Sequence, residues 1–143
     1  MSTIMQIANA DRHLSILSKG LKSSGLEDAL NENGPFTMLA PVNLAFGNLT
    51  PASWEELLKP ANKVRLSDLL SYHIINEKRL LKDFINGQKL TTINGRELKV
   101  TVKDGEVSIN GAKILSRDRQ GSNGVVHSVD AVNIPPNPLH KVD

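Results

Sequence analysis

Two short turn signals, Asp104-Gly105 and Asn110-Gly111, constrain the fold of this 143-residue chain more than any other feature. Such pairs, flanked by alternating apolar residues, are typical of two-residue β-hairpin turns. Counting outward from each turn gives compatible pairs, namely Lys103 with Glu106, Val102 with Val107, Val100 with Ile109, Ile109 with Ala112 and Val107 with Ile114. Both turns therefore predict one three-stranded meander over residues 97–116 with a single apolar face.

A third pair, Asn94-Gly95, fits a two-residue turn less well. That turn would set Thr91 opposite Leu98, so we expect a bulge or a different turn there. Further on, the loop 121–124 leads into residues 125–132, which carry apolar side chains on both faces of a strand. A strand of this kind is buried on both sides, so we expect it in the centre of a sheet.

The first half of the chain shows helical periodicity. Asp11 is a suitable N-cap for a first helix that Gly25 ends, with Leu14, Leu17 and Leu21 on one face. Two further helices are predicted over residues 51–59 and 62–72. Pro51 fits the first turn of the earlier helix, and Pro60 ends that helix. The apolar cluster at residues 4–8 either completes the core or forms an interaction element.

One short strand interrupts the helical half. Residues 36–40 alternate large apolar residues with a β-branched one, and Pro41 should end the strand because it lacks a backbone N–H. We expect the Asn43 side chain to bond nearby backbone groups and to set up a tight helical turn. Phe46 would then fold back toward the strand. Helices followed by a meander and a buried last strand indicate an α+β fold.

Composition narrows the classes of function. A chain of this length forms about one domain, and 39% apolar with 22% charged residues is ordinary for a globular protein. The net charge of +2, with one Trp and one Tyr, argues against nucleic-acid binding. The absence of cysteine excludes disulfides, thiolate metal sites and a cysteine nucleophile.

The chain also lacks membrane and export signals. No apolar run reaches the roughly 18 residues of a membrane span. Residues 1–6 have neither the basic start nor the apolar core of a signal peptide. The protein is therefore either intracellular or begins after a removed signal, and the residues alone do not separate these two cases.

His73 and His127 are the strongest candidates for a reactive site. A zinc site needs three or four converging ligands. Without cysteine, the carboxylates of Asp68, Asp118 and Asp130 would have to join the histidines. We expect instead that each imidazole is a half-buried core residue, hydrogen-bonded to neighbouring backbone, with no metal and no cofactor. His127 should be mostly buried, and its replacement by alanine should lower stability without changing the metal content.

A hydrolase is the other chemistry to consider. Ser128 follows His127 on the last strand, so their side chains point to opposite faces and cannot form a nucleophile–base pair. The chain has no Gly-x-Ser-x-Gly elbow and no Gly-rich phosphate loop followed by Lys-Ser/Thr. We therefore expect that the protein is not an enzyme.

Four stretches resemble motifs of the fasciclin-like domain family and occur in the order that the family shows. Phe36–Phe46 resembles the first fasciclin motif, and Tyr72–Ile75 resembles the Tyr-His motif. Asn110-Gly111 matches the turn between late strands, and Asn123–Asp130 resembles the second fasciclin motif. The resemblance assigns a structural role to Phe36, Ala40, Pro41, Asn43, Phe46, Tyr72, His73, Asn123, Gly124, His127 and Asp130. It covers about residues 3–136 as a single domain and leaves 137–143 as a flexible tail.

The resemblance implies an α+β fold in which two β-sheets form a wedge, with helices packed around one edge. It also implies a non-catalytic adhesion or binding module, as in cell-surface and extracellular matrix proteins. Such a module works outside the cytoplasm, here as a secreted, periplasmic or surface protein of a bacterium. Its partner would be a protein or a glycan, and we expect a monomer. A small-ligand carrier with an apolar pocket and an enzyme of undetected type remain alternatives.

The sequence departs from the family pattern at positions that could affect partner binding. Val42 stands where a hydroxyl residue is usual, which removes a cap worth about 1 kcal/mol. Leu44 replaces a commonly polar residue. Asp118 matches the first residue of an Asp-Ile pair implicated in integrin binding by some animal relatives, but Arg119 replaces the isoleucine. The candidate partner-binding residues are Tyr72, His73, Asp118, Val42 and Leu44.

Overall fold

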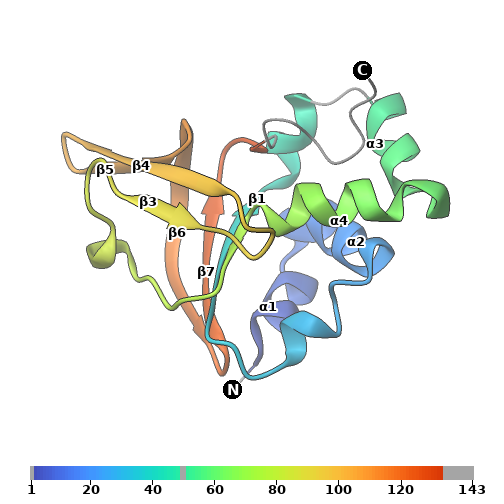
Figure 1. Ribbon diagram of the computed structural model, residues 1–143, viewed down its shortest axis with the longest axis horizontal. Coiled ribbons are helices and arrows are strands. Elements are labelled where there is room, and N and C mark those ends of the chain that lie inside the picture. The colour runs from blue at the N-terminus through green and yellow to red at the C-terminus, as the bar shows by residue number, and fades with distance from the viewer. Residues whose placement is uncertain (1, 49–50, 134–143) are drawn as a thin grey trace.

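The computed structural model describes residues 2–48 and 51–133, and its α-helices lie in the first half of the chain (Figure 1). The α-helices are α1 (Ile4–Ala10), α2 (Ser15–Ser24), α3 (Pro51–Leu58) and α4 (Lys63–Ser71). Short 3-10 helices are η1 (Arg12–Leu14), η2 (Ala29–Asn31), η3 (Asn43–Asn48), η4 (Pro60–Asn62) and η5 (Leu81–Asp83). The predicted helices are thus present, although Asp11 caps η1 and not α2 itself.

The N-terminal apolar cluster belongs to the core. α1 begins with a capping box in which Thr3 and Gln6 bond each other's backbone N–H groups. Its residues Ile4, Met5 and Ala8 are buried, and the helix packs against α2, β1 and β7. These side chains are therefore not available as a separate interaction element.

The strands of the described residues form one mixed sheet of seven strands, in the order β2-β1-β7-β6-β5-β4-β3. They are β1 (Phe36–Pro41), β2 (Ile74–Ile75), β3 (Lys89–Thr91), β4 (Glu97–Lys103), β5 (Glu106–Ile109), β6 (Ala112–Gly121) and β7 (Gly124–Val129). The prediction of two separate sheets is wrong. The sheet bends back until its edge strands meet, where Ile75 of β2 forms a bridge with Thr92 just after β3.

Irregular pairing along β6 explains how one sheet can bend back on itself. The register between β6 and β7 shifts between Ile114 and Ser116 and again between Ser116 and Arg119. Such shifts bend a strand and increase its twist. The sheet therefore folds over its own inner face without being divided into two.

The hairpin turns set the register of β4, β5 and β6. The three predicted pairs across the Asp104-Gly105 turn are all present, and Ile109 lies opposite Ala112 across the second turn. The β5–β6 ladder ends at Ser108 and Lys113, however, one pair before the predicted contact of Val107 with Ile114. At the Asn94-Gly95 turn Thr91 lies opposite Glu97, which confirms that this turn is not a simple two-residue one.

β7 lies in the centre of the sheet, as predicted for residues 125–132, although the strand ends at Val129. It runs parallel to β1 and antiparallel to β6, and all of its residues are buried. Its two faces meet two cores: Val126 packs beneath the helices, and Val129 packs inside the bent sheet. In β1, Met38 and Leu39 divide between the same two cores.

β1 ends at Pro41, as predicted, and Phe46 folds back into the core beneath the helices. The Phe46 ring packs on Trp54, with ring centroids 4.8 Å apart. The turn itself is closed by backbone, because the Ala45 N–H donates to the Val42 carbonyl at 2.8 Å. The corner therefore does not depend on a capping side chain at position 42.

Asn43 acts differently from the prediction, because its side chain bonds a distant segment. Its Oδ1 accepts the N–H of Ile16, 27 residues earlier, at 2.9 Å. Its Nδ2 donates to the Arg12 carbonyl at 3.0 Å and to the Ser15 hydroxyl at 2.9 Å. Asn43 thus holds the start of α2 against the corner after β1.

Two expectations fall outside the described residues, namely the flexible tail at 137–143 and the last residues of the predicted domain, 134–136. Within residues 2–48 and 51–133, every helix is too short or too polar to cross a membrane.

Candidate functional site

Asn123 joins four parts of the chain just before β7. Its Oδ1 accepts the N–H of Ile4 at 2.8 Å, and its Nδ2 donates to the carbonyls of Leu30 at 2.8 Å and Glu32 at 2.7 Å. Its own carbonyl accepts the N–H of Phe36 at 2.9 Å. The buried amide therefore fastens the start of α1, the turn around η2 and the start of β1 to β7.

Gly124 lets β1 and β7 approach each other. A Cβ at this position would lie 2.1 Å from the Phe36 carbonyl oxygen, so no side chain fits there. Phe36 is half-buried against the helical core, and Ala40 is fully buried in it. These motif residues all lie in the interior contact between the first and last described strands.

His127 is buried in β7, as predicted, and faces the inside of the bent sheet. Its Nε2–H donates to the Arg79 carbonyl at 2.7 Å, and its Nδ1 accepts the N–H of Asp118 at 3.1 Å. These partners suit a neutral imidazole. Burial lowers the pKa of His127, opposed by the Arg79 carbonyl and by the Asp118 carboxylate, 4.0 Å from Nδ1.

His73 is also buried and also neutral. Its Nδ1–H donates to the Leu69 carbonyl at 3.0 Å, and its Nε2 accepts the N–H of Asn133 at 2.9 Å. Burial lowers the pKa of His73 to about 4, because the bond to Leu69 offsets only part of the cost of charging a buried ring. The ring ties the end of α4 to the segment that follows β7.

Tyr72 and Asp130 complete the polar contacts of the motifs. The buried Tyr72 hydroxyl donates to the Glu97 carbonyl at 2.9 Å and accepts the Asn110 amide at 2.9 Å. The Asp130 carboxylate accepts the N–H of Lys113 at 2.8 Å, and its own N–H donates to the Lys113 carbonyl. Both residues thus hold strands and turns of the sheet together.

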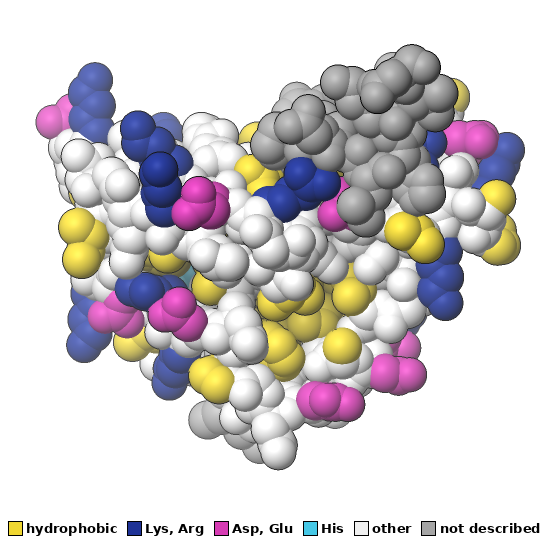
Figure 2. Space-filling view, viewed as in Figure 1, with side chains coloured by type: hydrophobic (Ala, Val, Ile, Leu, Met, Phe, Trp, Pro, Cys, Tyr) yellow, Lys and Arg dark blue, Asp and Glu magenta, His cyan; other side chains and the backbone are white. Residues whose placement is uncertain are grey.

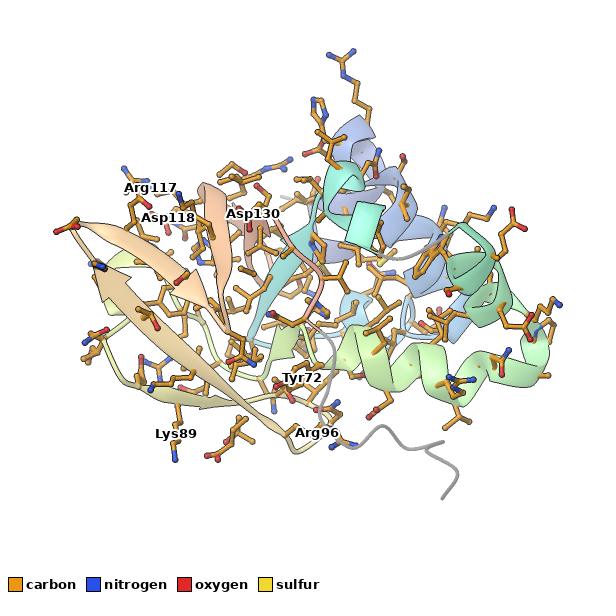
Figure 3. The ribbon with its side chains drawn as sticks, turned by 90° about the horizontal axis from the view of Figure 1, so that it is seen from above. Tyr72, Lys89, Arg96, Arg117, Asp118 and Asp130 are labelled. Atoms are coloured by element: carbon orange, nitrogen blue, oxygen red, sulfur yellow. The ribbon has the colours of Figure 1, made fainter. Side chains whose placement is uncertain are left out.

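The five candidate partner-binding residues do not form one surface. Tyr72 and His73 are each 1% exposed, so a partner cannot touch them without displacing the elements that cover them. Val42 is half-buried, and Leu44 is 92% exposed on η3. Asp118 lies on β6, away from Tyr72, as the labelled side chains in Figure 3 show.

Asp118 serves the fold through both its backbone and its side chain. Its φ is 56°, a conformation that few residues other than glycine adopt. Its Oδ1 accepts the N–H of Leu81 at 2.8 Å, and its N–H donates to His127. The next residue, Arg119, pairs with Asp11 near the helices. Asp118 therefore fastens η5 to β6, and Arg119 turns toward α1.

A groove opens where β5 and β6 separate, and no sequence motif indicates it. We call it the hairpin groove; it consists of two adjoining pockets of about 440 and 270 Å³. Its apolar lining is Leu80, Leu81, Phe84, Val102, Val107, Ile114 and Leu115, and its charged lining is Lys82, Arg117, Lys113, Glu106 and Asp118. Lys113 and Glu106 pair with each other at 3.1 Å. Lys82 and Arg117 make no ion pair with any described carboxylate.

The groove has no histidine in its lining. Among residues 2–48 and 51–133, no three His, Asp or Glu side chains are placed to hold a metal ion. His73 and His127, whose pKa values are lowered, do not line the groove, and both bond backbone through each ring nitrogen. The groove can therefore offer apolar contact and positive charge to a ligand.

The fold places the chain in a known structural class. Its structure is similar to one described as a FAS1 domain pair from the insect cell adhesion molecule fasciclin I, with a TM-score of 0.80 and 20% sequence identity. The likeness covers 98% of this chain and 51% of that chain. The class is thus an α+β domain with helices on one side of a bent mixed sheet.

The family follows from the sequence. The family model described as Fasciclin domain matches residues 12–135, and the chain therefore belongs to the fasciclin family. Protein sll1483 of Synechocystis sp. is 38% identical over 134 residues, which cover 94% of this chain and 74% of that protein. Transforming growth factor-beta-induced protein ig-h3 of Sus scrofa is 32% identical over 136 residues. Periostin of Homo sapiens is 29% identical over 135 residues.

The relatives differ in how much of their length this chain matches. The match with the Sus scrofa protein includes 95% of this chain but only 20% of that protein. The match with periostin includes 94% of this chain but only 16% of periostin. The shared part is one fasciclin domain. Fasciclin domains are in general non-catalytic binding modules.

Proposed function

We propose that the chain is a non-catalytic binding module that works outside the cytoplasm and holds an extended segment of a partner protein in the hairpin groove. One observation carries the proposal. The groove combines an apolar lining with the two cations Lys82 and Arg117, which form no ion pair with a described carboxylate, although Asp118 lines the same pocket. Protein interfaces commonly combine apolar contact with arginine in this way.

The groove also defines the chemistry of its partner. Apolar side chains would bury against the apolar lining, and acidic side chains would meet Lys82 and Arg117. Beyond Lys113, β6 has no ladder partner on the β5 side within the described residues. An extended peptide could pair with that edge as an added strand. The partner segment is therefore extended, apolar and acidic.

The two alternatives have less support. A carrier would need an enclosed apolar cavity, whereas both pockets of the hairpin groove open to solvent. An enzyme would need titratable groups poised for chemistry on the groove. In its lining Lys113 and Glu106 pair with each other, and the Asp118 carboxylate accepts the N–H of Leu81. The name of the fold relative, an insect cell adhesion molecule, supports a place outside the cytoplasm. Fractionation of the source cells would test that location.

Selection from a library of random linear peptides tests the binding role. We expect the selected peptides to combine acidic and apolar residues. The double variant Lys82→Gln, Arg117→Gln should bind them about tenfold more weakly. The control Lys19→Gln, Lys22→Gln has the same change in charge on α2 and should bind as the wild type does. Mass spectrometry should recover the peptides unmodified.

Two results would contradict the proposal. Basic or neutral peptides that bind the double variant as tightly as the wild type would exclude the hairpin groove as the site. Cleaved or modified peptides would favour the enzyme alternative. The variant Leu115→Ser gives a second check, because Leu115 lines the groove and is 54% exposed, so its loss should weaken binding without unfolding the domain.

A further inference from the structure

A second surface lies on the solvent side of β3, β4 and β5. We call it the lysine face; its residues are Lys89, Thr91, Glu97, Lys99, Thr101, Lys103, Glu106, Ser108 and Lys113. Alternation along β4 produces it, because Leu98 and Val100 are buried while the residues between them are exposed. Figure 2 shows several Lys and Arg side chains over this part of the molecule.

The lysines of this face, Lys89, Lys99, Lys103 and Lys113, outnumber its carboxylates, Glu97 and Glu106. Lys89 lies directly opposite Lys99 across the β3–β4 ladder, an arrangement of like charges that weakens a sheet. Glu106 lies opposite Lys103 but forms its ion pair with Lys113, at 3.1 Å. Lys89, Lys99 and Lys103 form no ion pair with the carboxylates that the structure describes. Figure 3 shows Lys89 pointing away from the sheet.

A shallow hollow lies at one end of the lysine face. It has a volume of about 290 Å³ and is lined by Thr101, Lys103, Asp104, Glu106, Ser108 and Lys113. Thr101 and Ser108 lie opposite each other on β4 and β5, so two hydroxyl groups lie side by side on the exposed face. The hollow thus offers hydroxyl and ammonium groups to a ligand, and the carboxylates of Asp104 and Glu106 also line it.

The side chains of the lysine face indicate which class of anionic ligand it can bind. The lysine face contains no apolar residue and no aromatic residue. A surface that binds a protein usually supplies apolar or aromatic residues at its centre, and one that binds single-stranded nucleic acid supplies aromatic rings on which the bases stack. A neutral sugar would likewise lack a ring to stack on. A polymer that carries both hydroxyl groups and spaced negative charges needs neither.

We propose that the lysine face binds an acidic polysaccharide, a chain of sugars that carries carboxylate or sulfate groups. The anions occupy the space between Lys89 and Lys99 and beside Lys103, and the sugar hydroxyls bond Thr101 and Ser108. From Lys99 to Lys103 the face extends about 13 Å along β4. Several anionic groups of one chain can therefore bind at once. This proposal does not rest on the hairpin groove.

Isothermal titration with defined polymers tests the proposal. The probes are heparin for sulfate, polygalacturonate for carboxylate, dextran as a neutral polysaccharide, and polyglutamate and single-stranded DNA as other polyanions. We expect heparin or polygalacturonate to bind more tightly than polyglutamate and DNA, and dextran not to bind. Binding should weaken as salt rises, because the contacts are exposed ion pairs.

Variants locate the site. The triple variant Lys89→Gln, Lys99→Gln, Lys103→Gln should weaken polysaccharide binding by about tenfold. The control Lys19→Gln, Lys22→Gln, Lys63→Gln has the same change in charge on α2 and α4 and should bind like the wild type. Thr101→Val with Ser108→Ala removes the hydroxyls alone and should weaken binding by a smaller factor. Thermal unfolding confirms that each variant is folded.

Three outcomes would overturn the proposal. Equal loss of binding in the triple variant and its control would show attraction to net charge alone. Equal or tighter binding of polyglutamate or DNA would show a different class of partner. Unchanged binding in the triple variant would place the site elsewhere. The groove variant Lys82→Gln, Arg117→Gln should leave polysaccharide binding unchanged, so failure of one proposal is distinguishable from failure of the other.

Discussion

Acidification should destabilise the domain through His73. Burial lowers the pKa of this histidine to about 4, whereas a histidine in an unfolded chain titrates near 6.5. Between these two pH values the unfolded chain binds a proton that the folded chain does not. Protons therefore favour unfolding, and stability that is complete above about pH 6.5 is lost as the pH falls toward 4.

The two pKa values set the size of the effect. One pKa unit corresponds to about 1.4 kcal/mol, so the full difference amounts to about 3 kcal/mol. At pH 4.5 most of this difference should already be lost, because the folded protein is then still mostly unprotonated at His73. His127 adds a loss of the same sign, since burial also lowers its pKa.

Urea unfolding of wild type and of His73→Gln, at several pH values from 7 to 4.5, isolates the contribution of His73. The variant is less stable at pH 7, because it loses buried hydrogen bonds, but the gap to wild type should narrow by about 2 to 3 kcal/mol at pH 4.5. A gap for His73→Gln that is constant with pH would refute the reasoning.

Two further predictions concern the contact between β1 and β7. Asn123→Ala should lower the free energy of unfolding by about 3 kcal/mol, because the N–H of Ile4 and the carbonyls of Leu30 and Glu32 lose their partners. A loss below about 1 kcal/mol in urea unfolding would contradict this. Gly124→Ala should cost at least about 3 kcal/mol, since its Cβ would lie 2.1 Å from the Phe36 oxygen. Gly47→Ala, with open space around its Cβ, is the control, and equal melting temperatures would contradict the register.

The parts of the fold that the sequence predicts correctly are those in which local chemistry decides the structure. Asp104-Gly105 and Asn110-Gly111 specify turns by themselves, and the alternation beside them sets which residues face each other. Residues 125–132 are apolar on both faces, and this alone places a strand in the interior. Pro41 ends its strand because of its own covalent structure.

The errors concern contacts between residues that are far apart in the chain. One sheet forms where two were expected, because irregular pairing bends β6 and Ile75 meets Thr92. The partners of Asn43 lie a whole helix earlier, and no local pattern identifies them. The hairpin groove exists because β5 and β6 separate after Lys113, although their alternation fits a longer ladder. These features depend on tertiary packing.

The place of β7 in the sheet determines when the domain can be completed during synthesis. β7 is the last described strand along the chain, yet it lies between β1 and β6. Until residues 124–129 have been made, β1 and β6 each present an unpaired edge, which is a template for aggregation. A chain that stops before Gly124 lacks the strand that lies between β1 and β6. The two edges are therefore paired only after residues 124–129, near the end of the domain, have been synthesised.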